Sequence, residues 1–139
     1  MASIKLLHNY PVSKEKIWSY LTSDERLTSW CLPSKNFLLE RGRQFRFEST
    51  PSVFWDGVFI NTILDFEVNS FLSYRCINEG LNLNTVVTWR IRSSNDSVQL
   101  SLEHSGFRPF KDLLIKIALT GGWKNMMRKS LYDQLTAAN

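Results

Sequence analysis

Residues 110–135 constrain the fold more than any other segment, because they carry apolar side chains at helical spacing on two different faces. One stripe contains Phe110, Leu113, Leu114 and Ile117. A second stripe, rotated by roughly a quarter turn, contains Trp123, Met126, Met127, Leu131 and Leu135. The stripe changes at Gly121-Gly122, and a glycine costs about 1 kcal/mol in a helix interior. We therefore predict a long C-terminal helix, kinked or broken at these glycines, whose two pieces pack on one concave surface.

Most of the preceding chain alternates apolar and polar residues with a period of two, which predicts β-strands. The alternation covers residues 44–48, 71–77, 85–92 and 97–104, and residues 54–66 are rich in β-forming side chains. The connections at 68–70, 78–80 and 93–96 are short, which favours antiparallel neighbours. Asp56-Gly57 indicates a bulge or turn, so the face presented by residues 58–64 stays open at this point.

The N-terminal part reads as a strand followed by two short helices. Residues 3–10 alternate and stop at Pro11, Ser13 can cap a helix of about ten residues, and Thr22-Ser-Asp-Glu25 has the form of a capping box before a second helix. The order of elements predicts a single α+β domain over residues 1–139. In it, a curved antiparallel sheet of about six or seven strands packs against the long C-terminal helix.

Composition excludes several classes of protein. A hydrophobic content of 43% with 22% charged residues is typical of a globular chain. The net charge is +4, but the basic residues are scattered, so we expect no nucleic acid partner. Two cysteines, Cys31 and Cys76, without CxxC spacing indicate free thiols in a reducing cytoplasm. No apolar run approaches the roughly 18 residues of a membrane span, and we expect a cytoplasmic monomer.

The residue types that carry catalysis are sparse. His104 shares a strand face with Leu100 and Leu102, where its imidazole could orient a ligand, transfer a proton, or form part of a satisfied core. His8 has no sequence-near ligands for a metal. Ser105 lies on the opposite strand face from His104, and the sequence contains no nucleophile elbow, phosphate loop or dinucleotide fingerprint. We therefore expect no catalytic residues, no metal and no cofactor.

Seven segments of the sequence, in this order, resemble segments of a known protein family. They are residues 11–30, 42–47, 55–57, 72–74, 85–89 and 104–107, and Gly122-Trp123 followed by Met126, Leu131 and Leu135. Together they resemble the homologues of the activator of the 90-kDa heat-shock protein ATPase, a family of the START-like, helix-grip superfamily. The resemblance implies a curved sheet gripping the C-terminal helix, with an elongated cavity between them. In that superfamily the cavity commonly accepts lipids, polyketides, hormones or other apolar molecules.

The two walls of such a cavity would be built from large apolar side chains and one histidine. The candidates are Trp30, Phe45, Phe47, Phe54, Val87, Trp89, Leu102, His104, Phe107, Leu114, Ile117, Trp123 and Met127. The same side chains are equally compatible with a filled core.

Three functions stay open from the sequence. The first is binding of a small hydrophobic or amphipathic ligand, and the second is a co-chaperone-like interaction in the stress response, through a basic helix face formed by Lys124, Arg128 and Lys129. The third is a cavity enzyme of cyclase or aromatase type.

Overall fold

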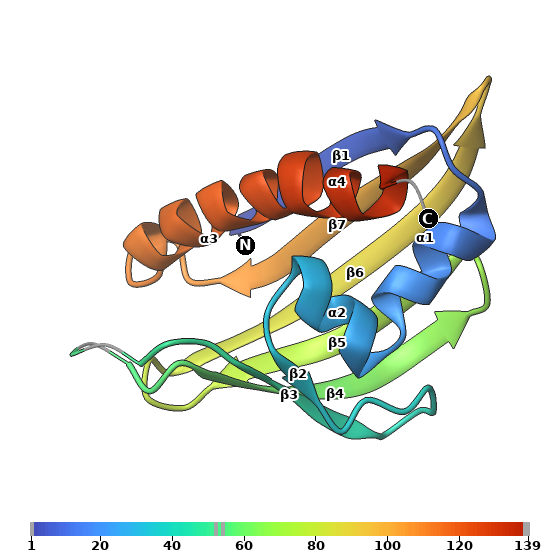
Figure 1. Cartoon of the computed structure of the whole chain (residues 1–139). Helices are drawn as coiled ribbons and strands as arrows, with labels where there is room; N and C mark the ends of the chain where they lie inside the picture. Colours follow the sequence, from blue (N-terminus) through green and yellow to red (C-terminus); the bar gives the residue numbers. More distant parts are fainter. Residues whose placement is uncertain (1, 52, 54, 138–139) are drawn as a thin grey trace.

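The computed structural model describes residues 2–51, 53 and 55–137, and over these residues it contains one seven-stranded antiparallel sheet and a group of helices on one side of it (Figure 1). The strands are β1 (Ala2–Tyr10), β2 (Ser34–Lys35), β3 (Gln44–Glu48), β4 (Val58–Glu67), β5 (Phe71–Asn78), β6 (Leu83–Ser94) and β7 (Ser97–Phe107). The helical segments are α1 (Lys14–Leu21), α2 (Asp24–Trp30), α3 (Leu113–Asn125), the π-helical η1 (Met126–Leu131) and α4 (Tyr132–Thr136). The predicted α+β helix-grip fold is confirmed.

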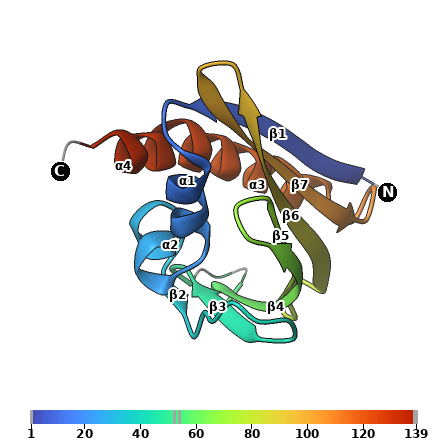
Figure 2. The same ribbon diagram turned by 90° about the vertical axis from the view of Figure 1, so that its right-hand side faces the viewer.

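The sheet has the order β1-β7-β6-β5-β4-β3-β2, so the first strand pairs with the last. Figure 2 shows the sheet curving around the side that carries the helices. The register places Ile4 opposite His104, and His104 opposite Val87. These residues therefore share the concave face on which the core is built.

The register of β4 answers the question that the Asp56-Gly57 pair leaves open. Phe59, Asn61 and Ile63 face the core, and the register shifts after Ile63. Gly57 has a φ of +80°, and a Cβ there would collide with the Ser49 carbonyl oxygen. Only glycine fits this turn, because an L side chain meets both the unfavourable dihedral and the neighbouring backbone.

The two N-terminal helices start at serines. The Ser13 hydroxyl accepts a hydrogen bond from the Lys16 N–H (3.1 Å), and the Ser23 hydroxyl accepts one from the Arg26 N–H (3.2 Å). The predicted capping box at Thr22 is therefore one residue out of position. Thr22 instead ends α1, where its hydroxyl donates to the Trp18 carbonyl (2.8 Å).

The C-terminal helix differs from the prediction in the position of its irregularity. α3 runs through Gly121 and Gly122 as continuous helix, so the predicted break there is wrong. The irregular turn is η1, which begins after both glycines. The buried residues Trp123, Met127, Leu131 and Leu135 are four apart, and on a regular α-helix such positions would drift by about 40° per step. A wider π-helical turn holds more residues and cancels this drift, so all four face the sheet.

Side chains from the N-terminal half hold this irregular helix in place. The Tyr10 hydroxyl donates to the Met127 carbonyl (2.6 Å) inside η1, and the Lys16 ammonium donates to the Leu135 carbonyl (2.8 Å) in α4. Tyr10 is fully buried. Among the residues that the structure describes, no helix is long and apolar enough to cross a membrane.

Candidate functional site

An apolar pocket of about 190 Å³ lies between the concave face of the sheet and α3. Its sheet wall comes from β3, β4, β5, β6 and β7, and its other wall comes from α3 and the start of η1. The lining residues are Leu32, Phe47, Ser49, Trp55, Phe59, Tyr74, Cys76, Val87, His104, Ala118, Leu119, Gly122, Trp123 and Met126. The pocket therefore matches apolar chemistry, with few polar groups in its wall.

His104 joins the two walls of the pocket. Its Nε2 lies 2.8 Å from the Thr85 hydroxyl oxygen, and that hydroxyl donates to the Cys76 carbonyl (3.0 Å). The Thr85 oxygen must therefore accept from His104, which places the imidazole proton on Nε2. The His104 Nδ1 accepts from the Trp123 indole N–H (3.1 Å) on α3. Both ring nitrogens are thus occupied in the neutral imidazole.

This arrangement decides between the roles that the sequence leaves open for His104. Burial lowers the pKa of His104 from 6.5 to about 4. A neutral ring whose nitrogens both have protein partners offers no proton and no free lone pair to a ligand at neutral pH. His104 is therefore a satisfied core histidine that connects the sheet to α3.

Three tryptophans pack edge to face beside His104. The ring centroids of Trp30 and Trp89 are 5.8 Å apart, and those of Trp89 and Trp123 are 5.3 Å apart. The Trp30 indole N–H donates to the Tyr20 carbonyl (2.8 Å), and the Trp89 indole N–H donates to the Tyr74 hydroxyl (3.2 Å). This row fills the space behind the pocket and fixes the position of its wall.

The residues predicted from the sequence fall into four groups. Those that line the pocket are Phe47, Val87, His104 and Trp123. Those that are buried in the surrounding core without lining it are Trp30, Phe45, Trp89, Leu102, Phe107 and Met127. Leu114 and Ile117 are 81% and 60% exposed on the outer side of α3, because the pocket-facing side of this helix carries Ala118, Leu119 and Gly122. Phe54 lies outside the described residues.

Several lining residues were missed by sequence reasoning. Tyr74 and Cys76 alternate correctly on β5, so the period of two could have identified them. Leu32, Ser49 and Trp55 lie outside regular strands and carry no periodic signal. Burial raises the pKa of the Cys76 thiol to about 12, so this thiol stays protonated and is a weak nucleophile. No group of three or more His, Cys, Asp or Glu side chains within residues 2–51, 53 and 55–137 could hold a metal ion.

Asn61 is a buried polar residue that the sequence did not single out. It points to the concave face from β4, opposite Cys76 on β5, and is fully buried. Within the described part of the chain, neither its amide nitrogen nor its amide oxygen has a hydrogen-bond partner. A buried amide without hydrogen bonds lowers the free energy of unfolding.

Replacing Asn61 with leucine is expected to raise the free energy of unfolding by about 1–3 kcal/mol, because it removes two unpaired polar atoms and keeps the number and branching of side-chain heavy atoms. The matched control is Asn78→Leu. Asn78 is equally buried, but it donates to the Asp56 carboxylate (3.0 Å) and the Val58 carbonyl (2.7 Å) and accepts from the Leu81 N–H (2.8 Å). That variant is expected to lose about 2–3 kcal/mol in urea denaturation. Equal destabilisation of both variants would show that Asn61 is paired in solution.

A curved antiparallel sheet that closes on a C-terminal helix over an apolar pocket defines the helix-grip, START-like class of proteins. The chain belongs to the family described as "Activator of Hsp90 ATPase homolog 1-like protein", which matches residues 11–136. This confirms the resemblance read from the sequence. No curated protein matches the chain.

Solved structures show the same fold. Protein MLL2253 from Mesorhizobium loti is 24% identical, with a TM-score of 0.84, and the match covers 99% of this chain and 100% of that one. The Aha1 dimer from Colwellia psychrerythraea is 17% identical, with a TM-score of 0.77 and coverage of 97% and 96%. CalU16 from Micromonospora echinospora is 21% identical, with a TM-score of 0.78 and coverage of 96% and 74%.

Proposed function

We propose that this protein binds a small apolar molecule in the pocket between the sheet and α3 and does not transform it. The pocket itself, about 190 Å³ and lined almost entirely by apolar side chains, is the observation that carries the proposal. An engineered apolar cavity of about 150 Å³ in another protein accepts benzene. A ligand with one substituted ring, or a short branched chain, therefore fits without rearrangement. A sterol, a long lipid or a polyketide would require α3 or Met126 to move.

The expected affinity is modest. Burying about 200 Å² of apolar ligand surface contributes about 5 kcal/mol, which corresponds to a dissociation constant of about 0.2 mM before the costs of binding. Tyr74 is the best polar contact for such a ligand. Its hydroxyl accepts from Trp89, and among the described residues its own O–H has no acceptor, so a ligand oxygen that reaches this hydroxyl can accept the bond. A ring that carries a ketone or ether oxygen is therefore favoured over a bare hydrocarbon.

Filling the pocket from α3 should abolish binding while the fold is kept. Gly122 lines the pocket, and apart from its chain neighbours and the backbone of its own helix no atom lies within 4 Å of the position of a Cβ. The same space is open at Gly121, which does not line the pocket. Gly122→Leu and Gly121→Leu therefore change helix propensity equally but differ in where the side chain lies. In amide chemical-shift titrations with toluene and acetophenone, Gly122→Leu is expected to bind at least tenfold more weakly than Gly121→Leu.

The two outcomes of this titration separate clearly. Saturable shifts near Trp123 and Val87 in the wild type and in Gly121→Leu, but not in Gly122→Leu, would support ligand binding in this pocket. Absence of saturable shifts in the wild type with either probe at roughly 2 mM, ten times the constant calculated before the costs of binding, would contradict the proposed function.

The alternatives from the sequence have less support. Docking on a heat-shock ATPase would use Lys124, Arg128 and Lys129, but the Lys129 ammonium lies 3.5 Å from the Asp133 carboxylate, which partly neutralises this face. A cyclase-type enzyme would need a proton-transfer group in the pocket. His104, the one histidine there, is held neutral with both nitrogens occupied.

A further inference from the structure

The start of α3 and the residues just before it present an apolar stripe to solvent. We call this set of residues the α3 stripe: Phe110 is 92% exposed, Leu113 48%, Leu114 81% and Ile117 60%. Leu113, Leu114 and Ile117 follow helical spacing on one side of α3, away from the pocket, and Phe110 lies in the turn just before the helix. An exposed cluster of large apolar side chains on one face usually marks a binding surface.

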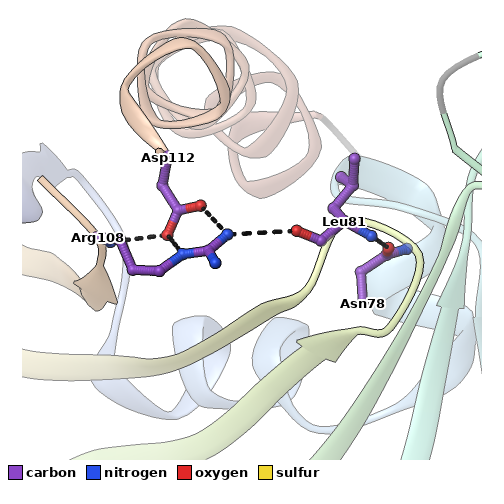
Figure 3. Close-up of polar contacts among 4 residues, drawn as sticks. All are labelled: Asn78, Leu81, Arg108 and Asp112. Carbon is purple, nitrogen blue, oxygen red and sulfur yellow. Dashed lines mark hydrogen bonds and ion pairs between the residues drawn. The ribbon is translucent and has the colours of Figure 1, made fainter. Parts of the chain in front are cut away.

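The segment that carries the α3 stripe, residues 104–132, is strongly basic in sequence. Between Glu103 and Asp133 the sequence has one acidic residue, Asp112, against six basic ones. Asp112 is buried and forms a close pair with Arg108, whose guanidinium Nη2 lies 2.7 Å from the carboxylate (Figure 3). The hydrogen bonds from Arg108 hold the pKa of Asp112 below its ordinary value, so this pair stays charged and internally neutralised. The other charged side chains of α3 and of the turn before it are Lys111, Lys116 and Lys124.

The Arg108–Asp112 pair also fixes the position of the helix that carries the α3 stripe. Arg108 donates to the Leu81 carbonyl (3.5 Å) in the turn between β5 and β6, and its backbone N–H donates to the Asp112 carboxylate (2.7 Å). Figure 3 shows the guanidinium between the start of α3 and this turn. The stripe is therefore presented on a rigid support and needs no folding step before it can bind.

Charge and size together select one occupant for this surface. A second copy of the chain would bring two basic stripes together, and a patch of four side chains on about two helical turns is far smaller than the roughly 1,200 Å² of a stable dimer interface. An anionic bilayer offers both matching features, since its headgroups attract lysines and its acyl boundary accepts apolar side chains at shallow depth. We propose that the α3 stripe, with Lys111 and Lys116, docks this protein on the surface of a bilayer that contains anionic lipid.

This proposal goes beyond ligand binding and depends only on the stripe and its charges. It also has a structural consequence for the pocket. Ala118, Leu119 and Gly122, which line the pocket, follow directly on the same helix. A docked α3 would therefore be the element that separates the pocket from the bilayer.

Vesicle co-sedimentation of the full chain without added ligand tests the proposal. The wild type is expected to bind vesicles of phosphatidylcholine and phosphatidylglycerol (3:1) at least tenfold more tightly than vesicles of pure phosphatidylcholine, and high salt should reduce this binding. Leu114→Ser is expected to weaken binding by about tenfold, and Lys111→Glu/Lys116→Glu by at least tenfold, because each lysine near an anionic surface contributes about a fivefold factor. All three side chains lie outside the core, so the variants should keep the wild-type fold.

Two matched controls make the result specific to the stripe. Leu7→Ser changes a leucine that is 57% exposed on β1, and Lys5→Glu/Arg92→Glu changes the net charge equally on the other side of the sheet. Both are expected to alter vesicle binding by less than threefold. Equal binding of the wild type to both kinds of vesicle, or an effect of the control variants as large as that of the stripe variants, would overturn the proposal.

Discussion

Replacing Trp123 with alanine is expected to lower the free energy of unfolding by about 3–5 kcal/mol, measured by urea denaturation. Trp123 is 6% exposed, packs edge-on against Trp89 at 5.3 Å, and donates its indole N–H to His104. The substitution removes a large buried ring and leaves the His104 Nδ1 without its donor. It also enlarges the pocket, since Trp123 is part of the wall.

Trp123→Phe separates the contribution of ring packing from that of the hydrogen bond to His104. It keeps an aromatic ring against Trp89 but removes the donor, so a loss of about 1–2 kcal/mol is expected. If ligand binding occurs in this pocket, the alanine variant should accept larger rings than the wild type, such as naphthalene in place of toluene. An alanine variant within 1 kcal/mol of the wild type would show that this contact contributes little to holding α3 on the sheet.

Acidification should destabilise the protein through His104. The unfolded chain carries this histidine with its ordinary pKa of 6.5, whereas burial lowers the pKa to about 4 in the folded state. Between these values the unfolded chain binds a proton that the folded protein does not. The free energy of unfolding therefore has its full value above pH 6.5 and decreases as the pH falls towards 4. The difference between the two pKa values of His104 corresponds to about 3 kcal/mol of folding stability. Urea denaturation between pH 7.5 and 4.5 measures most of it.

His104→Gln is the variant for this test, because its amide can still accept from Trp123 and donate to Thr85. Its stability should depend only weakly on pH in this range, apart from the contribution of His8, whose pKa is lowered by partial burial and by Arg128. His8→Gln should keep most of the wild-type dependence. Nitrogen chemical shifts give an independent readout, since the His104 ring should stay neutral with its proton on Nε2 at pH 5. A His104 ring that is protonated at pH 6 would refute the assignment.

The elements of the fold could be predicted because each rests on local patterns. The alternation in residues 71–77 and 85–92 defines two strands, and the short turns between them require antiparallel pairing. Ser13 gives a helix start that the structure contains. The helical spacing of Trp123, Met127, Leu131 and Leu135 identifies the face of the C-terminal helix that is buried. The family resemblance added the arrangement of sheet and helix as a whole.

The candidate site was predictable only in part. Phe47, Val87, His104 and Trp123 were identified because strand alternation and helix phase place them on the correct faces. Leu114 and Ile117 were assigned to the wrong side, because an apolar stripe indicates that a helix has a partner surface but does not show whether the same chain provides it. Asn61 gave no signal, since an asparagine between Ile60 and Thr62 looks the same whether its amide is paired or not.

The sequence by itself determined the class of fold, the inward faces of most strands and the apolar character of the site. These properties follow from side-chain periodicity, which each segment carries alone. The tertiary structure alone decided that His104 is neutral, that η1 rather than Gly121-Gly122 corrects the helix phase, and that the α3 stripe is exposed. Each of these depends on which distant segments meet, and a hydrogen bond such as Trp123 to His104 exists only once α3 lies on β7.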